Sequence, residues 1–353
     1  MSKKYRLLFF IIGLVGVGIM LLQVDFKAID WSHILTTKTI KFLLHMIVLW
    51  IGIHVIHAIN YKVILGKDGK NTKFLSLLKI CITSFALNSV TPAGLVGGEP
   101  YVIMELNKHC GTEKSASSTL IFTMFYVMGH VALIFGASIL YFVLGYNGGT
   151  FIDIFLILTI VISGYLTIRF IVVRDRGLVM SFMTVMTHIP FVKKFFIKLV
   201  NQYSELYKTI DNNIIEYRQK NYKFWTSFLL ELLSRILEGL EYYFIIRYIV
   251  GPTFVSVPDG IIVLAIASLV ANLLFIIPMQ AGTREGGMAL AFSFLDIGSS
   301  SVFLIGTLYR VREFLFIIAG ILLIWIGKTT TKIQEQIKEK RIEKGKDKDS
   351  KGQ

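Results

Sequence analysis

Residues 91–100 read TPAGLVGGEP, and residues 277–287 read IPMQAGTREGG. Each stretch interrupts an apolar segment with a proline, several glycines and, seven residues after the proline, a glutamate: Glu99 in the first stretch and Glu285 in the second. Backbone that leaves the helix at membrane depth must be buried in protein or line a wet cavity, because lipid offers no hydrogen-bond partners. Paired interruptions in two parts of a membrane protein point to a transport site.

The composition is that of an integral membrane protein. Of the 353 residues, 54% are hydrophobic and only 17% are charged, and the mean hydropathy is +0.65. Apolar runs of about 18 residues or more are long enough to cross a bilayer as helices. We expect about six full spans, with approximate bounds Leu7–Val24, Ile40–Tyr61, Ser117–Leu144, Phe151–Val173, Phe224–Val250 and Val302–Gly327. The first run has no small-x-small cleavage site after it, so we expect a retained helix and not a signal peptide.

The net charge of +14 is explained by membrane topology and not by nucleic-acid binding. Lys and Arg gather near the N-terminus, after the second span, between residues 174 and 223, and in the tail from residue 328. Residues 146–150, 251–260 and 296–301 contain neither Lys nor Arg. Basic loops stay in the cytoplasm, so both termini are predicted to be cytoplasmic.

This charge pattern predicts that the two interrupted stretches are re-entrant hairpins. The predicted helical limbs of the first hairpin are Phe74–Val90 and Tyr101–Cys110. They begin and end beside basic loops, so this segment enters from the cytoplasm and turns at Pro92–Glu99. The predicted limbs of the second hairpin are Gly260–Ile276 and Met288–Leu295. They begin and end beside loops without basic residues, so this segment enters from outside and turns at Pro278–Gly287. The expected hinge residues are Pro92, Gly94, Gly97, Gly98, Pro278, Gly282, Gly286 and Gly287. The alternative is two ordinary kinked helices with glycines at packing contacts.

The predicted fold is an all-α polytopic membrane protein with about six full transmembrane helices and two inverted re-entrant helical hairpins. Residues 1–328 form one membrane domain, with inverted halves at about residues 36–173 and 223–328, and residues 329–353 form a basic cytoplasmic tail. Residues 174–222 join the halves and carry apolar residues at helical spacing among lysines. This pattern favours an amphipathic helix on anionic lipid headgroups over a partner-binding helix. The apolar stripe comprises Phe191, Phe195, Leu199, Tyr203, Leu206 and Ile210.

Ionisable residues inside the predicted spans are candidates for function, because an unpaired charge in lipid costs several kcal/mol. In the fifth span Glu231, Arg235 and Glu238 share a helical stripe, which predicts that Arg235 bridges the two carboxylates. Two interpretations remain: the charges neutralise each other and fix helix packing, or they line a groove for a charged headgroup. The candidate substrate contacts are Glu99, Arg235, Glu238, Arg284, Glu285, Arg310 and Glu313.

Within this set, Arg310 and Glu313 can share a face of the last span, and Arg284 is the first candidate for holding a phosphate bidentately. Other chemistry is not indicated. His54 and His57 lie one turn apart with Asn60 nearby, a pattern that favours hydrogen bonding within the bundle over metal binding. The sequence has no Ser-His-Asp arrangement, nucleotide-binding glycine loop or zinc spacing, so we predict no catalytic residue, metal or cofactor.

The two glycine-glutamate stretches, together with Tyr309-Arg310-Val311-Arg312-Glu313, resemble the lysylphosphatidylglycerol synthase transmembrane-region family, whose members are also called flippase-like membrane proteins. The resemblance extends over roughly residues 7–328. It implies a bacterial cytoplasmic-membrane protein that moves a lipid or lipid-linked molecule between leaflets. The best-known members continue into a soluble aminoacyltransferase domain, whereas this sequence ends about 25 residues after its last predicted span. We therefore do not transfer a lysyl-transfer activity to it.

The family often carries an arginine shortly after the first glutamate, and residues 101–103 (YVI) offer none, which leaves Arg284 as the better phosphate contact. The leading hypothesis is a lipid translocase with Glu99 and Glu285 at the tips of hairpins that meet near the midplane, acting passively or coupled to ions through a buried glutamate. A second hypothesis is a membrane scaffold or helper subunit for a separately encoded lipid- or glycan-modifying enzyme. An intramembrane enzyme is disfavoured, because the sequence has no convincing nucleophile or set of metal ligands.

Overall fold

The computed structural model describes residues 36–69, 72–91, 97–175, 177, 179–188, 193–251, 255–273, 280, 282–295, 302 and 304–324. Regular structure within these ranges is entirely helical, which confirms the predicted all-α class. The helices are α3 (Thr37–Leu65), the 3-10 helix η1 (Gly66–Gly69), α4 (Phe74–Val90), α5 (Gly98–Cys110), α6 (Thr112–Val143), α7 (Thr150–Val172), α8 (Val179–Met186), α9 (Lys193–Gln219), α10 (Asn221–Val250), α11 (Val257–Leu273), α12 (Thr283–Phe294) and a last helix over residues 304–324. The predicted first span and the basic tail lie outside the described residues.

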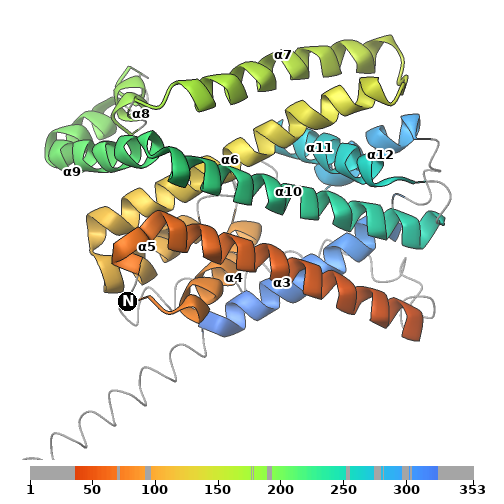
Figure 1. The fold of residues 1–353 in the computed structure, drawn as a ribbon, viewed down its shortest axis with the longest axis horizontal. Helices are drawn as coiled ribbons and strands as arrows, with labels where there is room; N and C mark the ends of the chain where they lie inside the picture. The colour runs from red at the N-terminus through yellow and green to blue at the C-terminus, as the bar shows by residue number, and fades with distance from the viewer. Residues whose placement is uncertain are drawn as a thin grey trace, which may run out of the picture.

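Long helices form the body of the molecule and run roughly along its longest axis (Figure 1). Within the described part of the chain, three helices, at Lys38–Leu65, Thr112–Val143 and Thr150–Val172, are long and apolar enough to cross a membrane. The chain is therefore a multi-pass membrane protein. The fifth and sixth predicted spans correspond to α10 and to the helix over residues 304–324, both of which carry several ionisable residues. The count of six spans stays a prediction.

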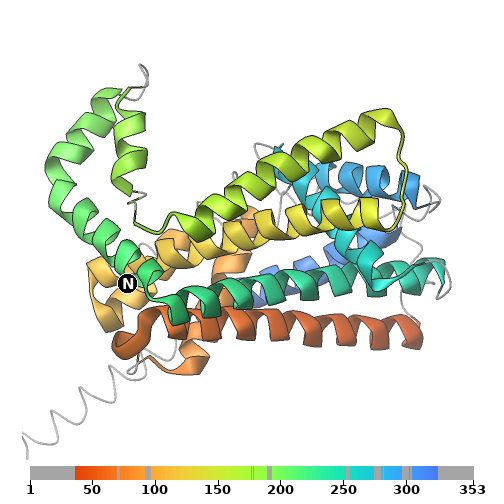
Figure 2. The same cartoon turned by 45° about the horizontal axis from the view of Figure 1, so that its top comes forward.

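Two pairs of short helices occupy the places where the sequence predicts hairpins. In each pair the two helices pack on each other, α4 on α5 and α11 on α12. The pair α4–α5 lies towards one end of the long helices and the pair α11–α12 towards the other, as both views show (Figures 1 and 2). The connecting residues 92–96, 274–279 and 281 lie outside the described residues, and with them Pro92, Gly94 and Pro278.

Glycines allow the close approach of the helices in each short pair. A Cβ on Gly98 of α5 would lie 2.6 Å from the carbonyl oxygen of Ser84 in α4. A Cβ on Gly287 of α12 would lie 2.7 Å from Cα of Ala267 in α11. Both distances are shorter than a van der Waals contact, so a larger residue would push the paired helices apart.

The segment between the two predicted halves folds into α8 and α9, which stand apart from the long helices at the end where α4 and α5 lie (Figure 2). Asp211 of α9 accepts hydrogen bonds of 2.8 Å from the backbone N–H groups of Val179 and Met180, so it caps the start of α8. Arg218 of α9 donates to the carbonyl oxygens of Phe170 and Val173 at the end of α7. These contacts tie the amphipathic segment to the membrane helices.

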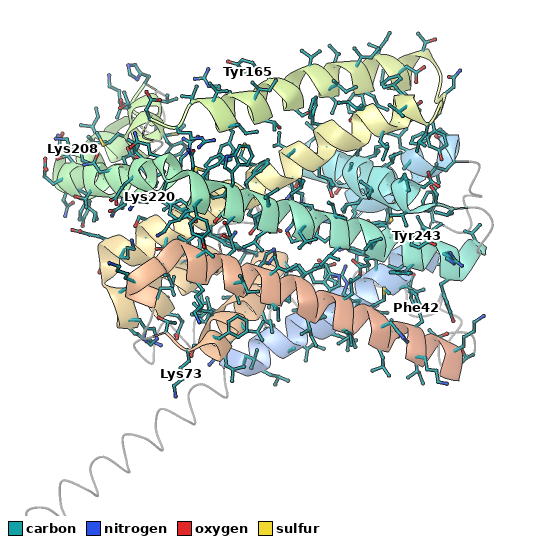
Figure 3. All side chains as sticks on the ribbon, in the orientation of Figure 1. Phe42, Lys73, Tyr165, Lys208, Lys220 and Tyr243 are labelled. Atoms are coloured by element: carbon teal, nitrogen blue, oxygen red, sulfur yellow. The ribbon has the colours of Figure 1, made fainter. Side chains whose placement is uncertain are left out.

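The outer face of the bundle is apolar, as lipid contact requires. Helix α7 packs on α6 and exposes a stripe of large aliphatic side chains on its other side. Their exposed fractions lie between 51% and 61% at Ile154, Ile157, Leu158, Val161, Ile162 and Ile168. Figure 3 shows Tyr165 on this outer side, and places Lys73, Lys208 and Lys220 towards the end of the bundle opposite to Phe42 and Tyr243.

Candidate functional site

Charged side chains gather in three clusters between the helices. The first, the hairpin cluster, joins α12 to the last helix and comprises Arg284, Glu285, Arg310 and Glu313. The Arg310 guanidinium donates two hydrogen bonds to Glu285, from Nε to Oε1 at 2.9 Å and from Nη2 to Oε2 at 3.3 Å. Its Nη1 donates to Glu313 at 3.0 Å, so Arg310 and Glu313 share a face as predicted. The pair Arg310–Glu285 is partly exposed, with side-chain exposures of 18% and 30%.

Arg284 differs from Arg310 because it donates hydrogen bonds to neutral groups and not to carboxylates. It donates to the hydroxyl of Tyr309 and, at 2.6 Å, to the side-chain oxygen of Gln280, both neutral groups. Of the carboxylates that the structure describes, none lies within ion-pairing distance of Arg284. Its guanidinium is therefore held by neutral groups and not by a direct ion pair. The carbonyl oxygen of Gln280 also accepts from Arg310 at 3.4 Å, which holds the two guanidinium groups around one residue.

Gln280, which accepts hydrogen bonds from both Arg284 and Arg310, has a strained backbone. Its φ is 52°, in the left-handed region that residues other than glycine rarely adopt. Gly282 follows with a φ of 78°, and its N–H donates to Glu285 at 3.0 Å at the start of α12. The chain therefore enters α12 directly after Gly282. The predicted hinge residues Gly286 and Gly287 lie inside this helix and not in the turn.

The second cluster is the buried pair Glu241–Arg312, which joins α10 to the last helix. Arg312 donates from Nε to Oε1 at 2.6 Å and from Nη2 to Oε2 at 2.8 Å, and both side chains are only 1% exposed. The guanidinium carbon lies 3.7 Å from the ring centre of Trp50 and 4.3 Å from that of Tyr309. Since Tyr309 also bonds Arg284, this one ring links the buried pair to the hairpin cluster.

The third cluster, the central cluster, surrounds Arg235 of α10. Its Nη1 donates to Glu238 at 2.8 Å and to Nε2 of His130 in α6 at 3.0 Å, and its Nη2 lies 3.4 Å from Nε2 of His57 in α3. Its guanidinium also lies over the ring of Tyr126. Arg235 and Glu238 therefore pair as predicted.

The expected bridge from Arg235 to Glu231 is wrong in this structure. Glu231 instead accepts from the amide of Asn60 at 2.7 Å and faces His57 at 3.6 Å. The reason is that the guanidinium of Arg235 turns towards the two histidines and Tyr126 on neighbouring helices, which no spacing along α10 reveals.

Glu99 lies apart from these clusters, at the start of α5. Its Oε1 lies 3.4 Å from the amide nitrogen of Asn88 in α4, and the oxygen of that amide accepts the N–H of Gly98 at 2.7 Å. Among the described residues, the buried Oε2 of Glu99 has no hydrogen-bond partner. Asn88 thus joins the two helices of the first pair. The Glu285 carboxylate, by contrast, is engaged by Arg310.

His57 takes part in hydrogen bonding, as the sequence pattern favoured, whereas neither ring nitrogen of His54 has a partner among the described residues. His57 contacts Arg235 and Glu231, while His54 is packed among the rings of Trp50, Phe85 and Phe316. The described part of the chain contains no group of three or more His, Cys, Asp or Glu residues that could hold a metal ion. The candidate residues predicted from the sequence do not include His130, Asn88, Gln280 and Tyr309. For His130 and Asn88 the signal is a polar atom in an apolar segment, whereas Gln280 and Tyr309 lie in the stretches that carry the family resemblance.

Fold and site together define a helical multi-pass membrane protein with charged side chains clustered between its helices. Residues 7–320 match the family model described as the lysylphosphatidylglycerol synthase TM region, so the chain belongs to that family. This membership indicates a membrane role related to lipids. Neither the curated proteins nor the solved structures contain a match to the chain.

Proposed function

We propose that this protein moves a lipid or lipid-linked headgroup across the bacterial cytoplasmic membrane. In this proposal α4–α5 and α11–α12 are re-entrant hairpins that enter from the cytoplasmic and the outer face, respectively. Their placement towards opposite ends of the long helices supports inverted entry (Figures 1 and 2). The end that carries Lys73, Lys208 and Lys220 is assigned to the cytoplasm with both termini, because basic loops remain there (Figure 3).

The observation that carries the proposal is the partly exposed hairpin cluster. A phosphate presents two oxygens to a guanidinium in the same way as a carboxylate does, so it can replace Glu285 in the fork of Arg310. Arg284, which donates to Gln280 as Arg310 does, adds a second positive charge that forms no direct ion pair with a described carboxylate. Once displaced, Glu285 is free to receive an amine or a sugar hydroxyl of the same headgroup, together with Glu313.

The remaining candidate residues extend a polar path towards the other helix pair. Arg235 and Glu238 lie in α10, and Glu99 lies at the start of α5. A headgroup that meets such groups in turn avoids the full cost of moving its charge through hydrocarbon while its acyl chains stay in lipid. The lysines of α9, among them Lys208, contact anionic headgroups at the cytoplasmic face in this proposal.

The test is leaflet exchange of labelled lipids in liposomes that contain the purified protein. Loss of a hydrogen bond to a charged group costs about 1.5–3 kcal/mol, so Arg284→Gln is expected to slow exchange by roughly 10- to 100-fold. Arg169→Gln, on the lipid-facing side of α7, is the matched control and is expected to leave exchange unchanged.

Two results would overturn the proposal. One is that no member of a broad panel of phospholipids and lipid-linked sugars exchanges faster with the protein than in empty liposomes. The other is that Arg284→Gln exchanges a lipid as fast as the unaltered protein does. Stable co-purification with a lipid- or glycan-modifying enzyme, combined with either result, would favour a scaffold role.

A further inference from the structure

We infer that Glu231 of α10 and His57 of α3 form a buried proton-binding site, in which one proton bridges Oε2 of the carboxylate and Nε2 of the imidazole. The inference concerns the binding of a proton and not of a lipid. Any part that the site plays in driving transport rests on the proposed function.

The hydrogen-bond pattern leaves two acceptors facing each other. A guanidinium has only donors, so the contact from Arg235 to His57 requires an unprotonated Nε2, and the neutral ring carries its proton on Nδ1. The Oε2 atom of Glu231 lies 3.6 Å from this Nε2 and has no hydrogen-bond partner among the described residues, although Glu231 is 0% exposed. An unpartnered lone pair of Oε2 thus faces Nε2 in a buried site, and a proton placed between them would satisfy the carboxylate oxygen while Nε2 gives up its 3.4 Å contact with Arg235.

The net charge of the central cluster also favours the binding of one proton. Glu231 and Glu238 carry two negative charges when ionised, and Arg235 carries one positive charge, so the ionised carboxylates exceed the cations by one. The hairpin cluster and the buried pair, by contrast, contain equal numbers of Arg and Glu residues. An uncompensated charge in a buried site is costly, and one proton brings the central cluster to neutrality.

The second oxygen of Glu231 is held in place, which fixes the direction of the first. Oε1 accepts from Asn60 at 2.7 Å, Asn60 accepts from Ser227 at 2.6 Å, and Ser227 lies 2.6 Å from the hydroxyl of Tyr217 at the end of α9. This chain of hydrogen bonds orients the carboxylate so that Oε2 faces His57. Its members act as positioning residues.

Other ionisable groups face the site from every neighbouring helix. From α3 come His54, whose ring centre lies 6.1 Å from that of His57, and Tyr61. Helix α6 contributes Tyr126 and His130, α4 contributes Cys81, and α10 itself contributes Arg235 and Glu238. Arg235 is the cation nearest to the site, and it competes with the proton for the lone pair of His57. Binding of the proton at Nε2 therefore releases one donor of Arg235.

The experiment is pH-dependent infrared difference spectroscopy of the purified protein in nanodiscs without added lipid substrate. The unaltered protein is expected to show the carbonyl stretch of a protonated carboxylic acid appearing as the pH falls. Glu231→Gln, which keeps the contact with Asn60, is expected to lose this band, whereas Glu105→Gln on the surface of α5 is expected to retain it. His57→Leu is expected to move the midpoint by about one pH unit or more towards lower pH, because the protonated acid loses its acceptor.

The inference is overturned if folded Glu231→Gln shows the same carboxylic-acid band as the unaltered protein. Where Glu231→Gln does not give a monodisperse protein, Glu231→Asp decides: the inference expects a band with a displaced midpoint, and an unchanged midpoint contradicts it. Because the titration does not depend on leaflet exchange, intact titration combined with absent leaflet exchange would contradict the proposed function alone.

Discussion

A single buried ion pair, Glu241–Arg312, shows how the membrane helices tolerate charge. Two donors of one guanidinium meet two carboxylate oxygens, and the rings of Trp50 and Tyr309 cover the guanidinium. Taking both charges out of water is expensive, and the geometry compensates for much of that expense. Removing one partner leaves the other charge buried and alone.

Glu241→Gln is therefore expected to lower the free energy of unfolding by about 3–5 kcal/mol, the usual effect of breaking a buried pair. Thermal or denaturant unfolding in detergent measures this loss. Glu105→Gln removes a carboxylate from the more exposed pair with Lys108 and is expected to change stability by less than about 1 kcal/mol. Equal stability of the two variants would show that the buried pair contributes no more than a surface one.

At the scale of single residues, the sequence predicts which charged residues lie inside the bundle better than it predicts the residues that they contact. Arg310 and Glu313 lie three residues apart on one helix, so helical spacing alone predicts their 3.0 Å contact. Arg235 and His130 are 105 residues apart, and Glu241 and Arg312 are 71 apart. Such contacts depend on which helix faces which, and no local pattern contains that information.

Among the helices, the two short pairs are distinguished by close packing at glycine. In α12 the neighbouring residues Gly286 and Gly287 provide a matched comparison. A Cβ on Gly287 would lie 2.7 Å from Cα of Ala267, whereas a Cβ on Gly286 meets nothing within 4 Å. The face of α12 that carries Gly287 therefore sets its distance from α11.

Gly287→Ala is expected to destabilise the protein by about 1–3 kcal/mol, because backbone of α11 must move to admit the methyl group. Gly286→Ala is expected to be neutral or stabilising by up to about 1 kcal/mol, since alanine favours the helix over glycine. Unfolding midpoints of the two purified variants give the comparison. A Gly287→Ala variant as stable as Gly286→Ala would contradict this account of helix packing.

The helices of the two short pairs can largely be predicted from the sequence, whereas the extent of the turns between them cannot. The first limb was predicted at Phe74–Val90, the bounds that α4 has, because a basic segment and a proline mark its ends. The last limb was predicted to begin at Met288, but α12 begins at Thr283. Glycines suggested a longer turn, whereas tight packing on α11 and the hydrogen bond from Gly282 to Glu285 allow the helix to start earlier.

At the scale of the whole molecule, loop charge and hydropathy predicted a helical membrane protein with short helix pairs towards opposite ends of the bundle. Family membership over residues 7–320 agrees with the resemblance that the two glycine-glutamate stretches indicated. The central cluster was beyond prediction, because its members come from α3, α6 and α10. The proposed mechanism depends on one feature of this arrangement, namely entry of the two pairs from opposite faces of the membrane.

Cysteine accessibility tests that feature directly. In a background with Cys81→Ala and Cys110→Ser, single cysteines replace Lys73 or His109 at the outer ends of α4–α5, and Val257 or Ser293 at those of α11–α12. A membrane-impermeant maleimide is then applied to either side of oriented vesicles. We predict that Lys73→Cys and His109→Cys react only from the cytoplasmic side, and that Val257→Cys and Ser293→Cys react only from the outer side. Reaction of the two ends of one pair from opposite sides would show that the pair crosses the membrane, and would contradict the account.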